Sequence, residues 1–168
     1  DDTDEREGTT DTTASLTDAD KVPGSDGVTG KTYALDHTED GKVIAGDGST
    51  VLKVYFKLQF TVKYEPGDHG TFPVDTHGGL DLGDTTPDFA GSTTQHNPGY
   101  SFNGWSPAVA ETVTDDVTYV AQWTANSDTK YMVEYYYQQM DGSYSKADED
   151  EREGTTAGTA NLTAADQK

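Results

Sequence analysis

The sequence predicts a mainly β (α+β) protein with little helix, built from small modules in tandem. Apolar and polar residues alternate almost without a break from Val51 to Tyr64, and the same period of two returns at Val117–Trp123 and Tyr131–Gln138. Hydrophobic residues make up only 32% of the chain, yet the chain also has 10 Tyr, 5 Phe and 2 Trp, which sit in alternating patterns that disordered chains rarely contain. We therefore expect thin domains with acidic loops and small aromatic cores.

The first sixty residues contain two candidate β elements. Residues 1–30 are rich in Thr, Asp and Gly, and Lys31–Asp36 has the pattern of a short strand. Residues 42–56 are predicted to form a hairpin, because Gly46-Asp47-Gly48 supplies residues that tolerate positive φ. The alternating run over residues 51–64 is long for one strand. We expect two strands to abut there, one ending a module and the next opening another.

Further strands are expected downstream, separated by turn residues. Pro66–Gly70 has the composition of a turn, and residues 80–89 are expected to be irregular or a brief helical turn. The later strands are predicted over residues 99–105, 117–123 and 131–138, with a polar link over residues 125–130 and a turn at Asp141-Gly142. The aromatic residues expected to fill the core of the central module are Tyr100, Phe102, Trp105, Tyr119 and Trp123.

The chain contains an internal repeat. Asp4–Lys21 matches Asp150–Gln167 at a constant offset of 146 positions, with thirteen of eighteen residues identical and no gap. The identical residues include the whole run Asp-Glu-Arg-Glu-Gly-Thr-Thr. Repetition at a fixed offset indicates a tandem architecture, in which each repeat contacts its neighbours.

The repeat fixes the expected module boundaries. We expect residues 1–59 to be the C-terminal part of one module that lacks its first strand, and residues 131–168 to be the N-terminal part of the next copy. A different, complete module over residues 60–124 and a link over residues 125–130 lie between them. The tyrosine-rich strand 131–138 is then expected to complete residues 22–59 of a second molecule by strand swapping, or to fold back on its own chain.

Two families resemble these segments. Tyr131-Met-Val-Glu-Tyr-Tyr-Tyr-Gln138 with Asp141-Gly-Ser-Tyr144, and Gly48-Ser-Thr-Val-Leu-Lys-Val-Tyr-Phe56, resemble the mucin-binding-protein-type repeats of Gram-positive surface proteins. The segments 60–64, Gly99-Tyr-Ser-Phe-Asn-Gly-Trp105 and Val117-Thr-Tyr-Val-Ala-Gln-Trp-Thr124 resemble the internalin-type B repeat, also called the Listeria–Bacteroides repeat. The resemblance implies small β-grasp, ubiquitin-like modules of an adhesin that is anchored in the cell wall or secreted.

The composition disfavours several classes of partner. The formal net charge of -20 repels nucleic acid phosphates and anionic lipid head groups. No apolar run approaches the ~18 residues of a membrane span, so we expect neither nucleic acid binding nor membrane insertion. The absence of cysteine excludes disulfides and thiolate metal sites. We expect no cofactor.

Neither the acidic residues nor the histidines form a pattern that is typical of an enzyme active site. The runs 1–7 and 148–153 are expected to be solvated, turn-like segments, without apolar neighbours that would raise a carboxyl pKa. Clustered oxygens suit calcium, and the candidates are Asp2, Asp4, Glu5 and Glu7, although they lack the Asp-x-Asp-x-Asp-Gly spacing of a calcium loop. The histidines, expected to be exposed loop residues, are His37, His69, His77 and His96.

Two tyrosines form the candidate ligand site. Tyr55 and Tyr136 each lie on the face opposite the main apolar row of their strand, with Lys53 and Lys57 beside Tyr55 and Glu134 beside Tyr136. If the β-grasp arrangement places their strands side by side, they form an exposed aromatic patch suited to stacking on a sugar ring or a peptide. Ordinary cross-strand packing on a wet sheet face explains the same pattern and is favoured.

The sequence therefore suggests a non-enzymatic, extracellular repeat segment of a bacterial adhesin. Its expected role is that of a stalk or spacer, with a host mucin glycan or protein as the ligand class that the resemblance implies, and neighbouring repeats of the same chain as partners. The alternative is a carbohydrate-binding accessory module of a secreted glycan-active enzyme.

Overall fold

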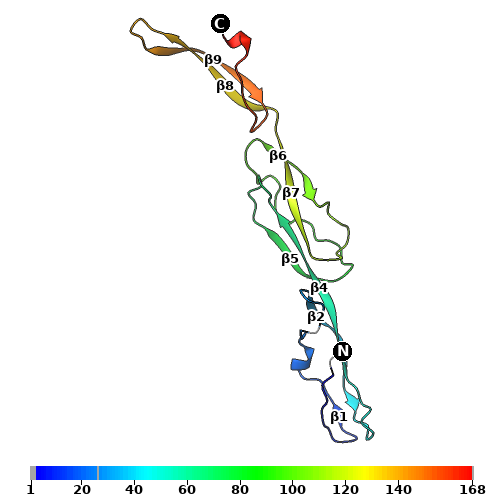
Figure 1. Ribbon diagram of the computed structural model, residues 1–168. Coiled ribbons are helices and arrows are strands. Elements are labelled where there is room, and N and C mark those ends of the chain that lie inside the picture. Colours follow the sequence, from blue (N-terminus) through cyan, green and yellow to red (C-terminus); the bar gives the residue numbers. More distant parts are fainter. Residues whose placement is uncertain (1–2, 26, 168) are drawn as a thin grey trace. The chain divides into compact units, whose positions relative to one another are not determined.

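The computed structural model describes residues 3–25 and 27–167 and is mainly β, with 44% strand and 4% helix (Figure 1). The mainly β class is thus confirmed. The chain divides into two compact units. The first comprises Asp1–Lys63, Thr76–Asp88 and Ala110–Thr118, and the second comprises Tyr64–Asp75, Phe89–Val109 and Tyr119–Lys168.

The first unit contains two antiparallel strand pairs. Strand β1 (Thr13–Ala14) pairs with β3 (Lys42–Val43). Strand β2 (Thr32–Glu39) pairs with β4 (Lys53–Glu65), from Thr32 opposite Gln59 to Glu39 opposite Lys53. The 3-10 helix η1 (Ala19–Lys21) lies between β1 and β2 in the sequence.

The predicted hairpin over residues 42–56 is wrong in its strand pairing, although its turn is present. Gly48 has a φ of +74° and donates its N–H to the carbonyl of Ala45. The Thr50 hydroxyl accepts the N–H of Ala45 and donates to the carbonyl of Val43. A side chain therefore closes this loop, and β3 and β4 are left to pair with β1 and β2.

Strand β4 is continuous where two abutting strands were expected. It runs unbroken over 13 residues, because its alternation never fails and no turn residue interrupts it. In the five-stranded sheet the order is β2-β4-β7-β6, where β7 is Val117–Ala125 and β6 is Tyr100–Ser106, and β5 (Asp75–Leu80) also pairs with β4. Phe60, Val62 and Tyr64 on one face of β4 are almost fully buried. The expected boundary between residues 59 and 60 thus falls inside one strand.

An aromatic cluster forms the core of the second unit. Strand β6 (Tyr100–Ser106) pairs with β7 (Val117–Ala125), with a register shift between Phe102 and Trp105. The Trp105 ring lies 4.8 Å from the ring of Tyr64 and 5.3 Å from that of Phe102. The predicted core aromatics are confirmed as part of this cluster, except that Tyr100 instead stacks on His69 at 3.7 Å.

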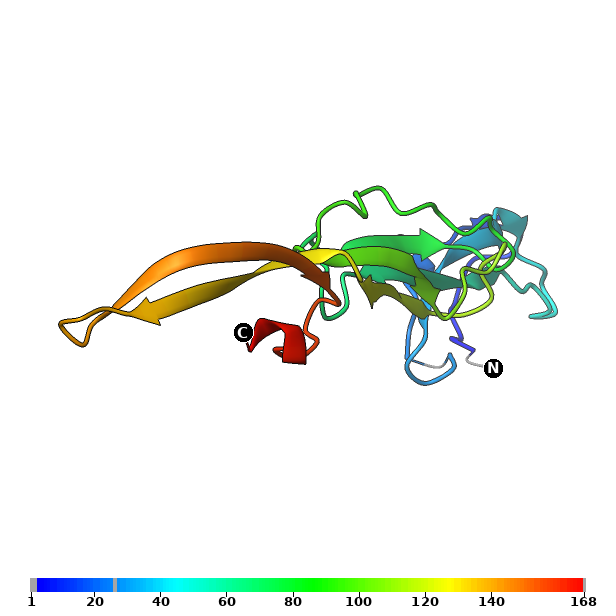
Figure 2. The same cartoon turned by 90° about the horizontal axis from the view of Figure 1, so that it is seen from above.

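The last part of the chain is a two-stranded antiparallel hairpin of β8 (Thr129–Gln138) and β9 (Tyr144–Gly154), followed by the 3-10 helix η2 (Ala164–Asp166) (Figure 2). Strand 131–138 therefore pairs within its own chain, which is the fold-back alternative of the prediction. The expectation that residues 148–153 are turn-like is wrong. They belong to β9, because the strongly alternating strand β8 forms backbone pairs with them, and almost all of them stay exposed.

Candidate binding surface

Tyr55 lies in a compact group of polar and aromatic side chains on the first unit. We call the group of His37, Glu39, Lys42, Lys53 and Tyr55 the Tyr55 surface. The β2–β4 register places His37 opposite Tyr55, and their rings stack with centroids 4.2 Å apart and an interplanar angle of 12°. The same register places Glu39 opposite Lys53. The surface is therefore a direct product of one strand pairing.

Glu39 organises the charges of the Tyr55 surface. Its carboxylate accepts hydrogen bonds from Lys42 Nζ at 2.8 Å and from the Tyr55 hydroxyl at 2.9 Å, and Lys53 Nζ lies 3.6 Å away. Lys42 and then Tyr55 stabilise the ionised form, which lowers the pKa of Glu39 to about 2. The group presents a stacked ring pair beside a fixed carboxylate and two ammonium groups. This arrangement can stack on a planar or ring-shaped ligand and donate hydrogen bonds to its oxygens.

Lys57, the third predicted residue on β4, has a different partner. Its ammonium group forms an ion pair with Asp81, which also accepts a hydrogen bond from the side chain of Gln59. Asp81 raises the pKa of Lys57. Lys57 thus forms a separate polar pair and does not share the Glu39 carboxylate.

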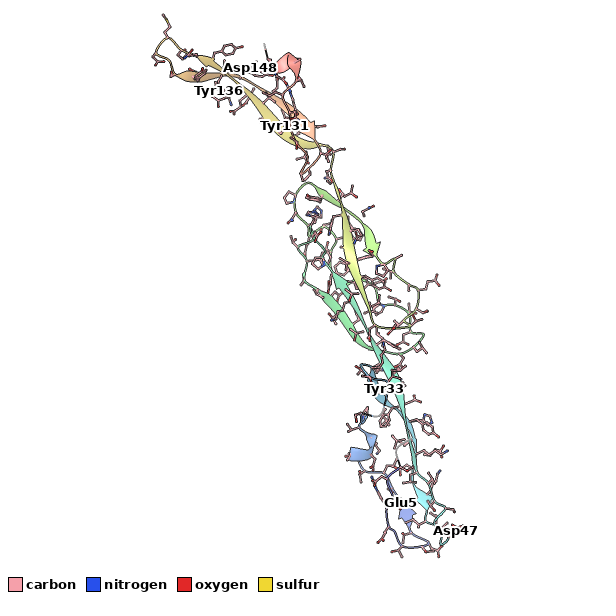
Figure 3. The ribbon with its side chains drawn as sticks, in the orientation of Figure 1. Glu5, Tyr33, Asp47, Tyr131, Tyr136 and Asp148 are labelled. Atoms are coloured by element: carbon pink, nitrogen blue, oxygen red, sulfur yellow. The ribbon has the colours of Figure 1, made fainter. Side chains whose placement is uncertain are left out.

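Tyr136 lies in the β8–β9 hairpin of the second unit, where its side chain is about half exposed (52%) (Figure 3). Its hydroxyl donates to Glu134 Oε2 at 2.6 Å, and Lys146 Nζ lies 3.0 Å from Glu134 Oε1. The strand of Tyr136 pairs with β9, whereas the strand of Tyr55 pairs with β2, β5 and β7. The predicted patch of both tyrosines requires their two strands to be neighbours in a sheet, and it stays a prediction.

The duplicated segment forms the same turn twice. Arg6 Nη1 donates to Asp20 Oδ2 at 2.8 Å, and Arg152 Nη1 donates to Asp166 Oδ2 at 2.8 Å. In each copy the aspartate also accepts the N–H and hydroxyl of a threonine three residues earlier, Thr17 or Thr163. Equivalent positions 11 and 157 have φ of +66° and +59°. We call each arginine–aspartate arrangement a clamp, and the ion pair lowers the pKa of both Asp20 and Asp166.

The acidic calcium candidates do not gather into a site in the described structure. Asp4 accepts two hydrogen bonds from Arg6, at 2.8 and 2.9 Å, and Glu5 and Glu7 are exposed (Glu5 in Figure 3). Asp2 lies outside the described residues. Among residues 3–25 and 27–167, no three His, Asp or Glu side chains converge in a way that could hold a metal ion.

The histidines are more structured than the sequence suggested. His37 and His77 lie on strands β2 and β5, which corrects the expectation that they are loop residues. His69 and His96 lie outside strands, where His69 stacks on Tyr100 and His96 lies 5.1 Å from the ring of Trp123. Sequence reasoning missed His37 and Glu39 as partners of Tyr55. The available signal was the predicted strand 31–36, which continues to residue 39 and so reaches both of them.

Comparison with known proteins adds no relative. No protein-family model matches the chain, and no curated protein or solved structure matches it either. In the described part of the chain, the helices are too short and too polar to cross a membrane. The internal repeat and the contacts of the Tyr55 surface and the clamps are therefore the features that bear on function.

Proposed function

We propose that this chain is an extracellular repeat segment of a bacterial cell-surface adhesin, acting as a stalk or spacer. The proposal includes β-grasp, ubiquitin-like modules over residues 1–59, 60–124 and 131–168. The first two share the continuous strand β4, and the last two are joined by the link 125–130, of which residues 126–128 lie outside strands. The observation that carries it is that the same arginine–aspartate clamp forms in both copies of the repeat, which are 146 residues apart. A unit that repeats in both sequence and local structure is typical of a tandem array. The net charge of -20 suits an exposed, soluble array.

Display on the cell surface can be tested with antibodies raised against this chain. Intact cells that produce the full protein are expected to be labelled, and brief protease treatment of those cells is expected to remove the signal. An antibody against a cytoplasmic protein serves as the control for cell integrity. Labelling that requires lysis of the cells would contradict the proposal.

The ligand of the adhesin is proposed to bind at the Tyr55 surface. The stacked rings of His37 and Tyr55 and the charges around Glu39 support a mucin glycan or a peptide as the ligand class. The same rings favour the second candidate function, a carbohydrate-binding accessory module of a secreted glycan-active enzyme. A catalytic domain elsewhere in the same polypeptide would favour that alternative, and a cell-wall sorting signal would favour the adhesin.

Binding of the full chain to a mucin glycan array tests the site. The variant Tyr55→Ala removes both the stacking face and the hydroxyl, and is expected to weaken binding about tenfold or more, since ring stacking and one charge-assisted hydrogen bond are lost. Tyr144→Ala is the control for the loss of a tyrosine elsewhere, because Tyr144 is exposed and lies outside the surface, whereas Tyr55 is half-buried. Equal binding by the native chain and a folded Tyr55→Ala variant would contradict the site, while leaving the stalk proposal standing.

A further inference from the structure

The clamp of the second copy is completed by a tyrosine from strand β8. The Tyr135 hydroxyl lies 2.9 Å from Asp150 Oδ2 and 3.2 Å from Asp166 Oδ1, and it accepts a hydrogen bond from Arg152 Nη2 at 3.2 Å. Asp150 and then burial raise the pKa of Tyr135 to about 12. The hydroxyl is therefore an integral member of this clamp.

The clamp of the first copy is the same arrangement without the tyrosine. The Arg6 side chain is 49% exposed, compared with 25% for Arg152, and Asp20 is 14% exposed, compared with 2% for Asp166. Within the described part of the chain, Arg6 forms hydrogen bonds and ion pairs with Asp4 and Asp20 and none with a tyrosine. The second copy thus shows that a tyrosine covers such a clamp, and among the described residues no tyrosine takes that place in the first copy.

The backbone beside the first clamp is also open. Residues 149–154 of the second copy belong to β9 and pair with β8 from Thr129 opposite Gly154 to Glu134 opposite Glu149. Residues 3–8 are their equivalents in the first copy, and no strand of the described part of the chain pairs with them. Unpaired backbone in an extended segment is a template for an added strand.

We propose that residues 3–8 and the Arg6–Asp20 clamp form a docking site for strand β8 of a second copy of this chain. In this arrangement β8 leaves its own β9 and pairs with residues 3–8 of the partner molecule. The hydroxyl of Tyr135 then contacts the clamp of the first copy as it contacts its own clamp. Asp4, Arg6 and Asp20 take the places of Asp150, Arg152 and Asp166. The inference depends on the internal repeat and is independent of the adhesin proposal.

The exchange changes the charge pairs of β8 in two ways. In the β8–β9 pair, Glu134 lies directly opposite Glu149, and Lys146 bridges the two carboxylates, with Nζ 3.0 Å from Glu134 Oε1. The equivalent of Glu149 in the first copy is Thr3, so in the exchanged pair no second carboxylate lies opposite Glu134. Lys130, which pairs with Glu151 at 2.7 Å, finds the equivalent Glu5 in the new partner.

The hairpin itself is suited to exchange. It is a separate two-stranded sheet whose β9 strand is almost entirely exposed, and such hairpins are at best marginally stable in water. Because the donor strand and the acceptor site are different surfaces of one molecule, the contact is head-to-tail. It therefore produces dimers and longer chains as the protein concentration rises.

Disulfide trapping tests both the contact and its register, because the native chain contains no cysteine. Met132 lies opposite Glu151, whose equivalent in the first copy is Glu5. Oxidation of an equimolar mixture of the Glu5→Cys and Met132→Cys single variants is expected to give a heterodimer at least about tenfold in excess of that from the Glu7→Cys and Met132→Cys mixture. The double variant Glu151→Cys with Met132→Cys is the control and is expected to close as an oxidised monomer.

Sedimentation velocity gives an independent measurement on chains without cysteine. Arg6→Gln is expected to weaken self-association about tenfold, since it removes the charged group that seats the tyrosine. Arg152→Gln is expected to strengthen it, because it loosens the hairpin that retains β8. Equal effects of the two variants, a native chain that stays monomeric, or equal trapping at positions 5 and 7 would each overturn the proposal.

Discussion

At the scale of single residues, Glu39 determines the character of the Tyr55 surface. Its carboxylate accepts hydrogen bonds from Lys42 and from the hydroxyl of Tyr55, and Lys53 lies 3.6 Å away, so one ionised group orders three side chains. Such a centre orders long side chains that would otherwise lose rotamer freedom on binding a ligand. The surface should therefore respond sharply to the protonation of this residue.

The first prediction concerns the pH dependence of that centre. The pKa of Glu39 is about 2 in the folded chain, against 4.5 for an unperturbed glutamate. A depressed carboxyl pKa contributes stability above pH 4.5, and this contribution disappears as the pH falls from 4.5 through about 2. The difference in melting temperature between the native chain and Glu39→Gln should thus be constant from pH 7 to pH 5 and should shrink below that.

The direct measurement is the carboxyl carbon chemical shift of Glu39 by NMR during an acid titration. Glu7, an exposed glutamate in the same unit, provides a signal for comparison from the same sample. A midpoint for Glu39 near the ordinary glutamate value would show that the contacts with Lys42 and Tyr55 do not persist in solution.

At the scale of secondary structure elements, the main difference from the expected module boundaries is that strand β4 continues across residues 59 and 60. Inserting one glycine between Gln59 and Phe60 would be harmless if two strands abutted there. In a continuous strand the insertion turns every following side chain to the opposite face. Phe60, Val62 and Tyr64 would leave the core, so we predict a loss of about 3 kcal/mol or more in the free energy of unfolding.

Urea denaturation of the insertion variant provides the measurement. A glycine inserted after Asp47, in the exposed turn of the same unit, is the matched control and is expected to change the stability by about 0.5 kcal/mol or less. Similar stabilities of the two insertion variants would indicate that residues 59 and 60 belong to separate strands.

Strand identity could be predicted from the sequence, but strand pairing could not. The alternation over residues 117–123 and 131–138 fixed those strands, because a period of two follows directly from backbone geometry. It did not reveal that β3 pairs with β1 or that His37 faces Tyr55, since these pairings join segments that are distant in the sequence. Strand β9 was missed because a run of acidic residues has low β propensity and forms a strand only beside β8.

The same limit applied to the candidate sites. Tyr55 could be singled out by its position on the polar face of an alternating strand, whereas Glu39 and Lys42 required knowledge of the register. The repeat was visible in the sequence at once, but its ion-pair clamp was not. Arg6 and Asp20 are fourteen residues apart, and the turn at Asp11 and the Thr17 contacts help to bring them together.

At the scale of the whole molecule, the dominant property is the excess of acidic groups. The chain has 31 acidic and 11 basic residues, giving a net charge of -20. Many of the basic side chains already have acidic partners in the described structure, including Arg6, Lys31, Lys42, Lys57, Lys130, Lys146 and Arg152. The remaining acidic groups repel one another, and this repulsion opposes folding.

The last prediction follows from that repulsion. Raising the salt concentration from ~0.01 M to ~0.15 M shortens the screening length from about 30 Å to about 8 Å. Salt also weakens the ion pairs, but most of them are exposed and each contributes about 1 kcal/mol or less. We therefore predict that the melting temperature rises with sodium chloride, and that Glu153→Gln, which removes one exposed acidic charge from the hairpin, reduces the increase.

Calcium chloride at matched ionic strength separates screening from a specific site. Asp4 is occupied by Arg6, and the described residues offer no converging set of three acidic ligands. Calcium should therefore raise the melting temperature no more than magnesium chloride does at the same ionic strength. A larger increase with calcium that is lost in Asp4→Asn would instead establish the acidic N-terminal segment as a calcium site, because only a coordinated ion distinguishes the two cations at equal screening.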